Sequence, residues 1–497
     1  MEPKVTLNRE LGMKEGISIT TGTVIGVGLF TTGAQCVGLM GGGIFLLTFI
    51  SLLTCILPAL MYAEMGAALP YAGGTYNYAK RAINVPVANI SAWHYLIALI
   101  AMCSTESLAF SNYFSWIFRG AGLSVNIDNR IIAAALMFFF VFINYKGVKV
   151  SGRWQNAFVY FFWSVSAVWM LYMIQHVDLG NFVPSQLATF PGFKAWVEVL
   201  TWIWWCYAGF ETCVGMGGEI KYPQINIPRA LFLSPFIIFI VNALFQWFLA
   251  GLVPLAEQSA LAASVAPYAE GLEKAGYMGF PIVLLCCGIA FGGDFSTLNP
   301  GVEVPARYIY QMGLDGCLPA FFGKLHPKYR TPTAAILFVG IVAFLLILTN
   351  SINFVAQINI CSLFWCYIIG FISFGELRRK EPELARPYKA PWAKFSVISS
   401  VAVYALMCWS CGWEHVGISF IITGCSLLFY FLYSRKKAVS KEEIIRIQQA
   451  EAVHLDEDIP DPETKAKMDS NYKKWKIIVT LMTVITILLY TISFVIK

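Results

Sequence analysis

The chain has 497 residues, of which 58% are hydrophobic and only 13% are charged. Soluble domains contain about 25% charged residues, so the composition excludes an ordinary soluble protein and indicates a membrane protein with many spans. The net charge of +6 does not indicate a nucleic-acid partner, because most Lys and Arg residues fall in loops on one side of the predicted spans. The same asymmetry predicts a cytoplasmic N-terminus.

The sequence contains no recognisable catalytic or metal-binding motif. The 13 cysteines lie mostly inside predicted spans and lack the paired spacing of a zinc site, which favours buried thiols. No nucleophile elbow, phosphate-binding loop, zinc-protease or dinucleotide motif occurs in a fitting context. We therefore expect neither an enzyme nor a bound cofactor.

Ten apolar runs follow a polar arm at residues 1–12, which we expect in the cytoplasm. The first five predicted spans cover residues 13–37, 42–69, 87–118, 131–145 and 156–174, and the second five cover 193–218, 230–254, 280–312, 333–348 and 352–375. Because five is an odd number, the second set enters the membrane with the opposite polarity. This predicts a five-plus-five inverted repeat that occupies residues 13–375.

The C-terminal part adds two or three spans to this all-α polytopic membrane protein. Spans 11 and 12 are expected within residues 376–434, and a charged cytoplasmic segment within 435–476. The apolar run at 477–497 is long enough to span. It shows no polar face, which favours a further span over an interfacial helix.

Two predicted helices, 1 and 6, contain glycine-marked interruptions. These are Gly22-Thr23-Val24-Ile25-Gly26-Val27-Gly28 and Ala208-Gly209-Phe210-Glu211-Thr212. Backbone that leaves the helical ladder at membrane depth persists only where it lines a cavity or is buried in protein. Interrupted helices at corresponding positions of two halves are typical of the substrate site of a secondary transporter.

The sequence around these breaks resembles the amino acid–polyamine–organocation transporter family. The resemblance rests on residues 22–30, 63–76, 207–211, 219–229, 307–316, 325–332 and 377–387, in family order and spacing. It implies a five-plus-five core, alternating access and small amine-bearing substrates. Two positions depart from the family: Val27 stands where Ser is frequent, and Phe162 stands where many proton-coupled members have Lys.

The first break is predicted to hold the substrate by its backbone. Free N–H groups at the start of the second half-helix suit a carboxylate, and the carbonyls before the break suit an ammonium group. We expect these contacts near Thr23, Ile25, Gly26, Val27 and Gly28. The alternative is that the glycines only allow close helix packing.

Three acidic residues lie well inside predicted spans: Glu106, Glu211 and Asp294. Such groups are costly in a bilayer and indicate function, and they favour a cationic or zwitterionic substrate. We assign Glu106 to substrate binding. Glu211 either carries a coupling proton or cation, or stabilises the second break as a neutral carboxyl.

Asp294 is followed on the same span by two hydroxyl residues, Ser296 and Thr297. This group is predicted to hold the coupling ion, Na⁺ or H⁺, with a sodium site as one form. An ammonium partner or a structural hydrogen bond for Asp294 are the alternatives.

The second break brings further candidates. Trp205, Tyr207, Ala208 and Gly209 are predicted to contact the substrate, and an aromatic ring can bind an ammonium group through a cation–π contact. Near the cytoplasmic end, Glu303 and Arg307 are four residues apart on one helix and are predicted to form a gate or a structural pair.

These features favour a secondary active transporter of an amino acid or small organic amine, coupled to a cation. An exchanger of an amino acid for an amine and a sensor that binds without translocating are the alternatives. The loop at 119–130 has no cysteine, so no disulfide-linked heavy chain is expected. We expect a monomer or homodimer in the inner membrane of a prokaryote.

Overall fold

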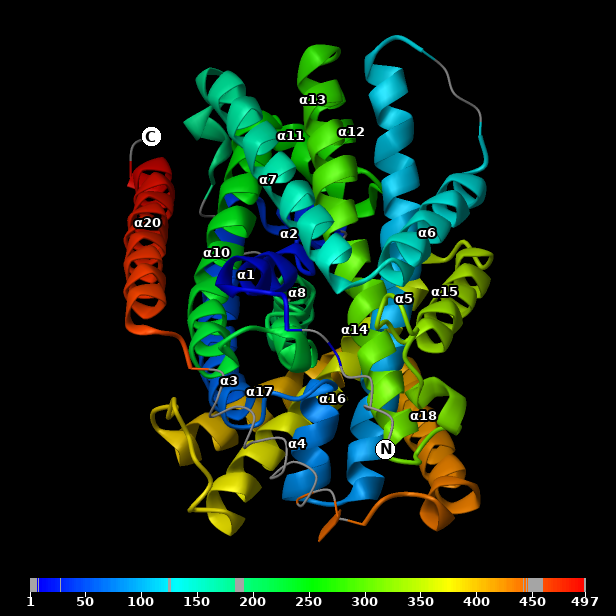
Figure 1. Cartoon of the computed structure of the whole chain (residues 1–497). Helices are drawn as coiled ribbons and strands as arrows, with labels where there is room; N and C mark the ends of the chain where they lie inside the picture. Colours follow the sequence, from blue (N-terminus) through cyan, green and yellow to red (C-terminus); the bar gives the residue numbers. More distant parts are fainter. Residues whose placement is uncertain are drawn as a thin grey trace.

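The computed structural model describes residues 7, 9–26, 28–123, 127–183, 192–440, 442–443, 445 and 459–495. Throughout these residues the chain is helical or forms connections, and its only extended pairings are two isolated bridges, Leu11 with Ile220 and Ala72 with Met216. The all-α architecture is therefore confirmed. Figure 1 shows the helices gathered into one bundle, with the amino-terminal helix α1 (Met13–Gly22) near its middle.

Many of the helices can cross a membrane. Among the described residues, nine helical stretches are long and apolar enough: Gly28–Ala68, Val85–Gly120, Val148–His176, Pro223–Leu252, Phe280–Leu314, Phe354–Lys380, Ala393–Ser410, Trp413–Lys436 and Pro462–Val495. A helix is suited to the bilayer because it satisfies its own backbone hydrogen bonds. The protein is an integral, multi-pass membrane protein.

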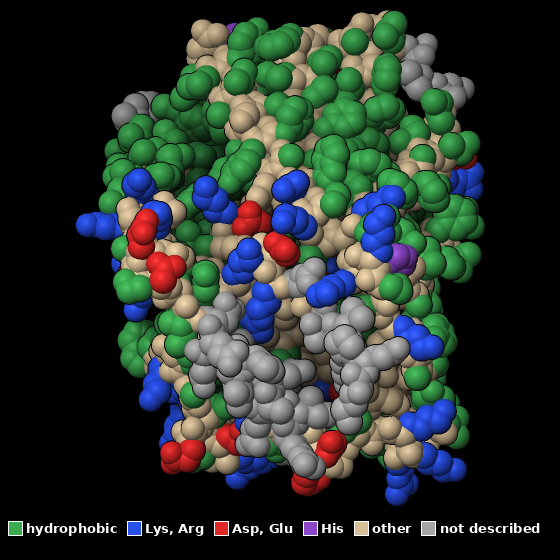
Figure 2. All heavy atoms as spheres, in the orientation of Figure 1, with side chains coloured by type: hydrophobic (Ala, Val, Ile, Leu, Met, Phe, Trp, Pro, Cys, Tyr) green, Lys and Arg blue, Asp and Glu red, His purple; other side chains and the backbone are tan. Residues whose placement is uncertain are grey.

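The surface agrees with a membrane location. Figure 2 shows hydrophobic side chains covering the upper part of the visible face, while Lys, Arg, Asp and Glu gather across its middle and lower parts. Several large apolar side chains are exposed on the outside of the bundle, including Phe138, Leu171 and Leu432. Exposed apolar area of this extent fits lipid better than water.

Both predicted helix breaks are present. α1 ends at Gly22, residues 23–26 form turns, and the chain continues as a π-helical segment, Gly28–Gly33, into α2 (Ala34–Met40). The second interrupted helix consists of α8 (Phe193–Trp205), turns at residues 206–211 and the short α9 (Thr212–Gly215). Discontinuous helices 1 and 6 are thus confirmed.

The helices follow the predicted order, with a broken helix at the start of each set of five. The first set continues with α3 (Ile44–Ala68), α5 (Val85–Gly120), α6 (Asn129–Tyr145) and α7 (Val148–Met173), and the second with α10 (Pro223–Leu252), α13 (Phe280–Gly288) joined to α14 (Phe295–Leu314), α15 (Thr333–Ile347) and α16 (Ile352–Lys380). The second helix of one set, α3, packs along the second helix of the other, α10.

A third irregularity was not predicted. The backbone between α13 and α14 is π-helical over Ile289–Asp294. A π-helical turn is wider than an α-helical turn and is frequent at functional sites. Gly293 in this segment lies against the first break, since a methyl group added there would be 3.1 Å from the carbonyl oxygen of Ile25. The segment therefore borders the interrupted part of helix 1.

The C-terminal helices are α17 (Ala393–Ser410), α18 (Trp413–Leu432) and α20 (Pro462–Val495). α20 begins within the segment predicted as cytoplasmic, before the apolar run at 477–497. Residues 441, 444, 446–458, 496 and 497 of these predicted regions lie outside the described residues. Figure 1 shows α20 beside α10 at the edge of the bundle.

Specific contacts hold α20 in this position. The Tyr490 hydroxyl donates to the Ala243 carbonyl at 2.9 Å, and the Trp247 indole donates to Ser493 at 2.8 Å. The Tyr490 ring also stacks on Phe45 of α3, with centroids 4.2 Å apart. That α20 spans the bilayer stays a prediction, which its length and composition favour.

Candidate functional site

The two helix breaks touch each other. The Cys206 thiol donates to the Gly28 carbonyl at 2.9 Å, and a methyl group added to Gly209 would lie 2.8 Å from Cγ2 of Thr23. Gly209 has φ of +98°, a left-handed conformation that a residue with a side chain rarely adopts. Glycine is needed at this point both for the turn and for the close approach of the two segments.

Within the first break, backbone hydrogen bonds that span two or three residues replace some of the regular bonds that span four, and a four-residue bond resumes at Phe30. The Gly26 N–H donates to the Val24 carbonyl at 3.0 Å, and the Gly26 carbonyl accepts from Phe30 at 2.9 Å. Thr23 donates its hydroxyl back to the Ile19 carbonyl at 2.6 Å. Thr23, Ile25, Gly26 and Gly28 all lie buried at the break, while Val27 lies outside the described residues. That they contact the substrate stays a prediction.

A carboxyl group from another helix lies against this break. A methyl group added to Gly26 would be 2.6 Å from Cδ of Glu106, so the missing side chain leaves room for that carboxyl. Glu106 lies on α5 and is 2% exposed. The predicted substrate residue Glu106 and the predicted backbone residue Gly26 therefore belong to one site.

Asp294 joins the same site from the π-helical segment. Its carboxyl group is fully buried and lies close enough to that of Glu106 for the two charges to influence each other. Neither Asp294 oxygen has a hydrogen-bond partner among the amide and hydroxyl groups of the described residues. Two buried carboxylates in contact repel each other strongly unless a proton or another cation lies with them. The pair is therefore a candidate place for a proton or another cation.

Asp294, Ser296 and Thr297 lie at the start of α14, and the two hydroxyl groups have backbone partners. The Thr297 hydroxyl donates to the Gly22 carbonyl at 2.8 Å, and the Ser296 hydroxyl donates to the Gly293 carbonyl at 2.8 Å. Both hydroxyls thus point to backbone carbonyls, away from the acidic pair. That these three residues together hold a coupling ion stays a prediction.

Gln155 on α7 was missed by the sequence reasoning. Its amide donates to the carbonyls of Ser18 and Ser296, both at 2.9 Å. It thus links α1, on the N-terminal side of the first break, to α14. Phe162, which stands at the family's lysine position, packs edge-on against Phe30 instead, with centroids 5.7 Å apart. A neutral amide therefore makes the polar link from α7 to the interrupted helix.

Glu211 in the second break is held by two phenol groups. Tyr95 donates to one carboxyl oxygen at 2.9 Å and Tyr367 to the other at 2.6 Å. The Tyr367 hydroxyl also accepts from the Gly209 N–H at 3.1 Å. Tyr367 therefore ties the acidic group to the unwound backbone, and Glu211 is surrounded by neutral donors.

The indole N–H of Trp205 and the hydroxyl group of Tyr207, both predicted to contact the substrate, point to different helices. The Trp205 indole donates to Asn359 of α16 at 2.8 Å, and its backbone carbonyl lies against Gly28. The Tyr207 hydroxyl donates to the Thr48 carbonyl at 2.9 Å, so it faces α3. Ala208 is buried within the second break itself.

Glu303 and Arg307 contact each other at 3.5 Å, but the stronger partner of Arg307 comes from elsewhere in the chain. Glu219, beyond α9, accepts from the Arg307 guanidinium at 2.9 and 3.0 Å, and both side chains are fully buried. The Glu219 carbonyl also accepts from the N–H groups of Glu10 and Leu11. These contacts seal the end of the bundle where the N-terminal arm packs.

The opposite end is covered by aromatic rings and also contains a groove. The Tyr113 hydroxyl donates to the Phe30 carbonyl at 2.6 Å, and the Phe30 ring packs edge-on against Tyr268. A groove of about 690 Å³ lies further out, beside Trp116 and Arg119. No group of three His, Cys, Asp or Glu side chains suited to a metal ion occurs in the described ranges.

Comparisons with known proteins agree with this geometry. Residues 11–432 match the family model described as amino acid permease. The chain is 23% identical to the branched-chain amino acid permease BcaP of Bacillus subtilis, over 87% of this chain and 94% of that protein. It is 23% identical to the methylthioribose transporter of the same organism, over 87% and 95%. It is also 24% identical to the large neutral amino acids transporter small subunit 2 of Mus musculus, over 89% and 84%.

Proposed function

Because the chain belongs to the amino acid permease family, we propose that it moves an amino acid or small organic amine by alternating access, and that a proton is carried with the substrate. The observation that carries this proposal is the contact between the first break and the buried acidic pair of Glu106 and Asp294. The substrate and the coupled cation would then share one site, so that binding of one alters binding of the other.

The chemistry of the pair favours a proton over sodium. A shared proton removes the repulsion of two buried carboxylates without further ligands, whereas a sodium ion needs several oxygen atoms around it. The hydroxyls of Ser296 and Thr297, which could supply them, donate to backbone carbonyls instead. A proton needs only the two carboxyl groups that are already in contact.

The surroundings of the break favour a substrate with an ammonium group. Backbone carbonyls of an interrupted helix and nearby carboxyl groups attract a cation. Trp205 brings its backbone carbonyl against Gly28, and its buried ring is the candidate for a cation–π contact of about 0.5–2 kcal/mol with the substrate. The relatives have names that range from branched-chain amino acids to methylthioribose, so a test of substrates needs a broad panel.

Buried ion pairs support an alternating-access cycle. Glu219 with Arg307 and Lys80 with Asp315 close the end of the bundle near the N-terminal arm. Buried pairs of this kind are costly to separate and can act as a gate that opens only after substrate binding. The basic loops at this end favour a cytoplasmic location for the arm, in the inner membrane of a prokaryote.

Transport by the purified protein in proteoliposomes tests the proposal. A panel of labelled amino acids and amines should accumulate when an inward proton gradient is imposed, and a sodium gradient at equal pH should give no such stimulation. Glu106→Gln should abolish the stimulation, whereas Glu383→Gln, at an exposed carboxyl, should retain it.

Other outcomes would identify the alternatives. Flux that strictly requires substrate on the opposite side would favour an exchanger. Saturable binding without flux would favour a sensor. Stimulation by sodium alone would contradict the proton proposal and leave the amine site unaffected.

A further inference from the structure

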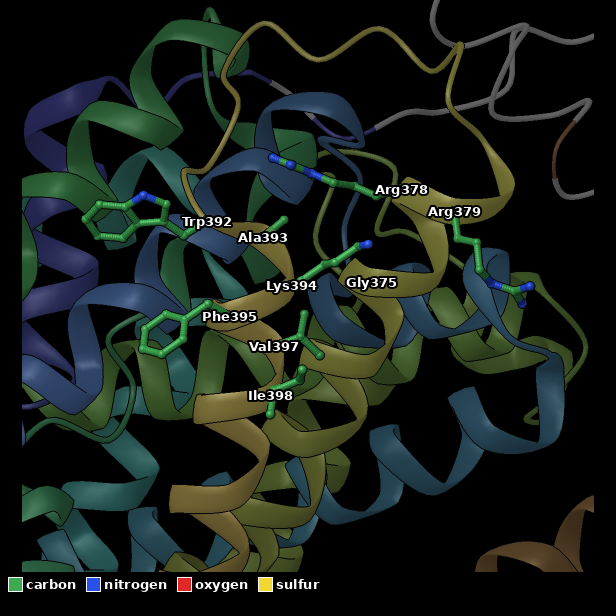
Figure 3. Close-up of a pocket in the computed structure, with 9 residues that line it drawn as sticks. All are labelled: Gly375, Arg378, Arg379, Trp392, Ala393, Lys394, Phe395, Val397 and Ile398. Atoms are coloured by element: carbon green, nitrogen blue, oxygen red, sulfur yellow. The ribbon is translucent and has the colours of Figure 1, made fainter.

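A groove between α16 and α17 lies far from the helix breaks in the chain and has no role in the function proposed above. Its volume is about 1130 Å³. Figure 3 shows it between the C-terminal end of α16, which contributes Arg378, and the first turns of α17, which contribute Lys394 and Phe395. The groove therefore lies where two predicted spans leave and re-enter the membrane.

The mouth of the groove carries an excess of positive charge. Glu64, which is almost fully buried, is shared by the guanidinium groups of Arg378 and Arg386 and also accepts from the Ala390 N–H. One carboxylate thus neutralises only one of the two arginines. Lys394 is exposed, and no carboxylate in the described part of the chain forms an ion pair with it.

A second carboxylate nearby is shared in the same way. Arg379 and Lys380 both pair with Glu376, at 2.7 and 2.8 Å. In these two clusters, counted with Lys394, five basic side chains face two acidic ones. The local charge therefore favours an anionic ligand.

The opposite wall of the groove is apolar and exposed. Trp392, Phe395 and Ile398 are 74%, 62% and 71% exposed. Tryptophan is enriched where a membrane meets water, and such bare apolar side chains on a spanning helix face lipid chains. Figure 3 shows Trp392 and Phe395 on the same side of the groove, and Lys394 directed toward α16.

The start of α17 adds a further attraction for an anion. An α-helix leaves its first N–H groups without intrahelical partners and carries partial positive charge there. In α17 this first turn is formed by the residues that line the groove, Ala393 to Phe395. A phosphate group placed beside Lys394 would meet both the ammonium group and the helix end.

We propose that this groove binds an anionic phospholipid. The phosphodiester headgroup would lie at Lys394, Arg378 and the start of α17, and an acyl chain would follow Phe395 and Ile398. A soluble phosphate would leave the apolar wall without a partner. A zwitterionic lipid carries its own cation and would leave the excess charge of the groove unbalanced.

Native mass spectrometry of the full-length protein, with phosphatidylglycerol or phosphatidylcholine added to the delipidated sample, tests this assignment. We expect phosphatidylglycerol to bind more tightly than phosphatidylcholine. Lys394→Gln should weaken phosphatidylglycerol binding about fivefold, because one lysine near an anionic lipid surface contributes about that factor. Lys389→Gln is the matched control, since Lys389 is an exposed lysine that does not line the groove.

The apolar wall has its own test. Ile398→Asn should weaken binding of the whole lipid, while excess inorganic phosphate should fail to displace it. Equal binding of both lipids, displacement by inorganic phosphate, or equal effects of Lys394→Gln and Lys389→Gln would each overturn the proposal.

Discussion

Gly26→Ala is the substitution that most sharply tests how the first break and the acidic site fit together. The added methyl group would lie 2.6 Å from Cδ of Glu106, well inside van der Waals contact. The Glu106 carboxyl would have to move away from Gly26, and its surroundings leave little room because Glu106 and Asp294 are both buried. Overpacking of this kind lowers the free energy of unfolding by roughly 1–3 kcal/mol.

The expected result is a lower melting temperature of the detergent-purified protein and loss of proton-stimulated transport. Gly424→Ala is the control, because Gly424 lies in α18 and a methyl group there meets nothing within 4 Å. That control should be neutral or stabilising, since alanine is favoured over glycine in a helix by roughly 1 kcal/mol.

A double variant separates the clash from other effects of the substitution. Glu106→Ala removes the group that the new methyl would meet, so Gly26→Ala should be better tolerated in that background. Transport should not return, because the acidic pair is lost. If Gly26→Ala behaved like Gly424→Ala, or if it destabilised the Glu106→Ala protein equally, the inferred contact would be refuted.

Three further predictions concern the polar contacts around the site. Tyr367→Phe should lower stability by roughly 1–3 kcal/mol in thermal unfolding, because one Glu211 oxygen loses its 2.6 Å donor; an unchanged melting temperature would contradict this role. Arg307→Gln should lower the free energy of unfolding by roughly 3–5 kcal/mol, because it leaves the Glu219 carboxylate buried and unpaired. Adding Glu219→Gln should restore part of this stability. A double variant that is no more stable than Arg307→Gln would contradict the pairing. Gln155→Leu should reduce both stability and transport because two buried carbonyls lose their donor, and normal transport would show that this link is dispensable.

The sequence was sufficient to predict the fold and the two breaks, for a clear physical reason. Glycine clusters inside apolar runs are conspicuous at membrane depth, where an unwound backbone is costly. The segments around Gly26 and Gly209 are both unwound in the structure. Helix order and approximate bounds followed from apolar runs of suitable length.

The contacts within the site were much harder to predict. Periodicity shows which residues share a face of one helix, but it does not show which helices become neighbours. Glu106 and Asp294 were recognised separately as buried acids, and only the packing of α5 against the π-helical segment brings them together. The partnership of Arg307 with Glu219 was missed for the same reason, since local spacing directed attention to Glu303.

The central claim is that the buried acidic pair beside the first break holds a proton. Infrared spectroscopy of the purified protein near neutral pH, without sodium, tests this most directly by detecting the carbonyl stretch of a protonated carboxyl group. We predict a band that is lost in both Glu106→Gln and Asp294→Asn and that shifts when a transported substrate is added. A spectrum in which neither substitution removes a protonated-carboxyl band would contradict the account.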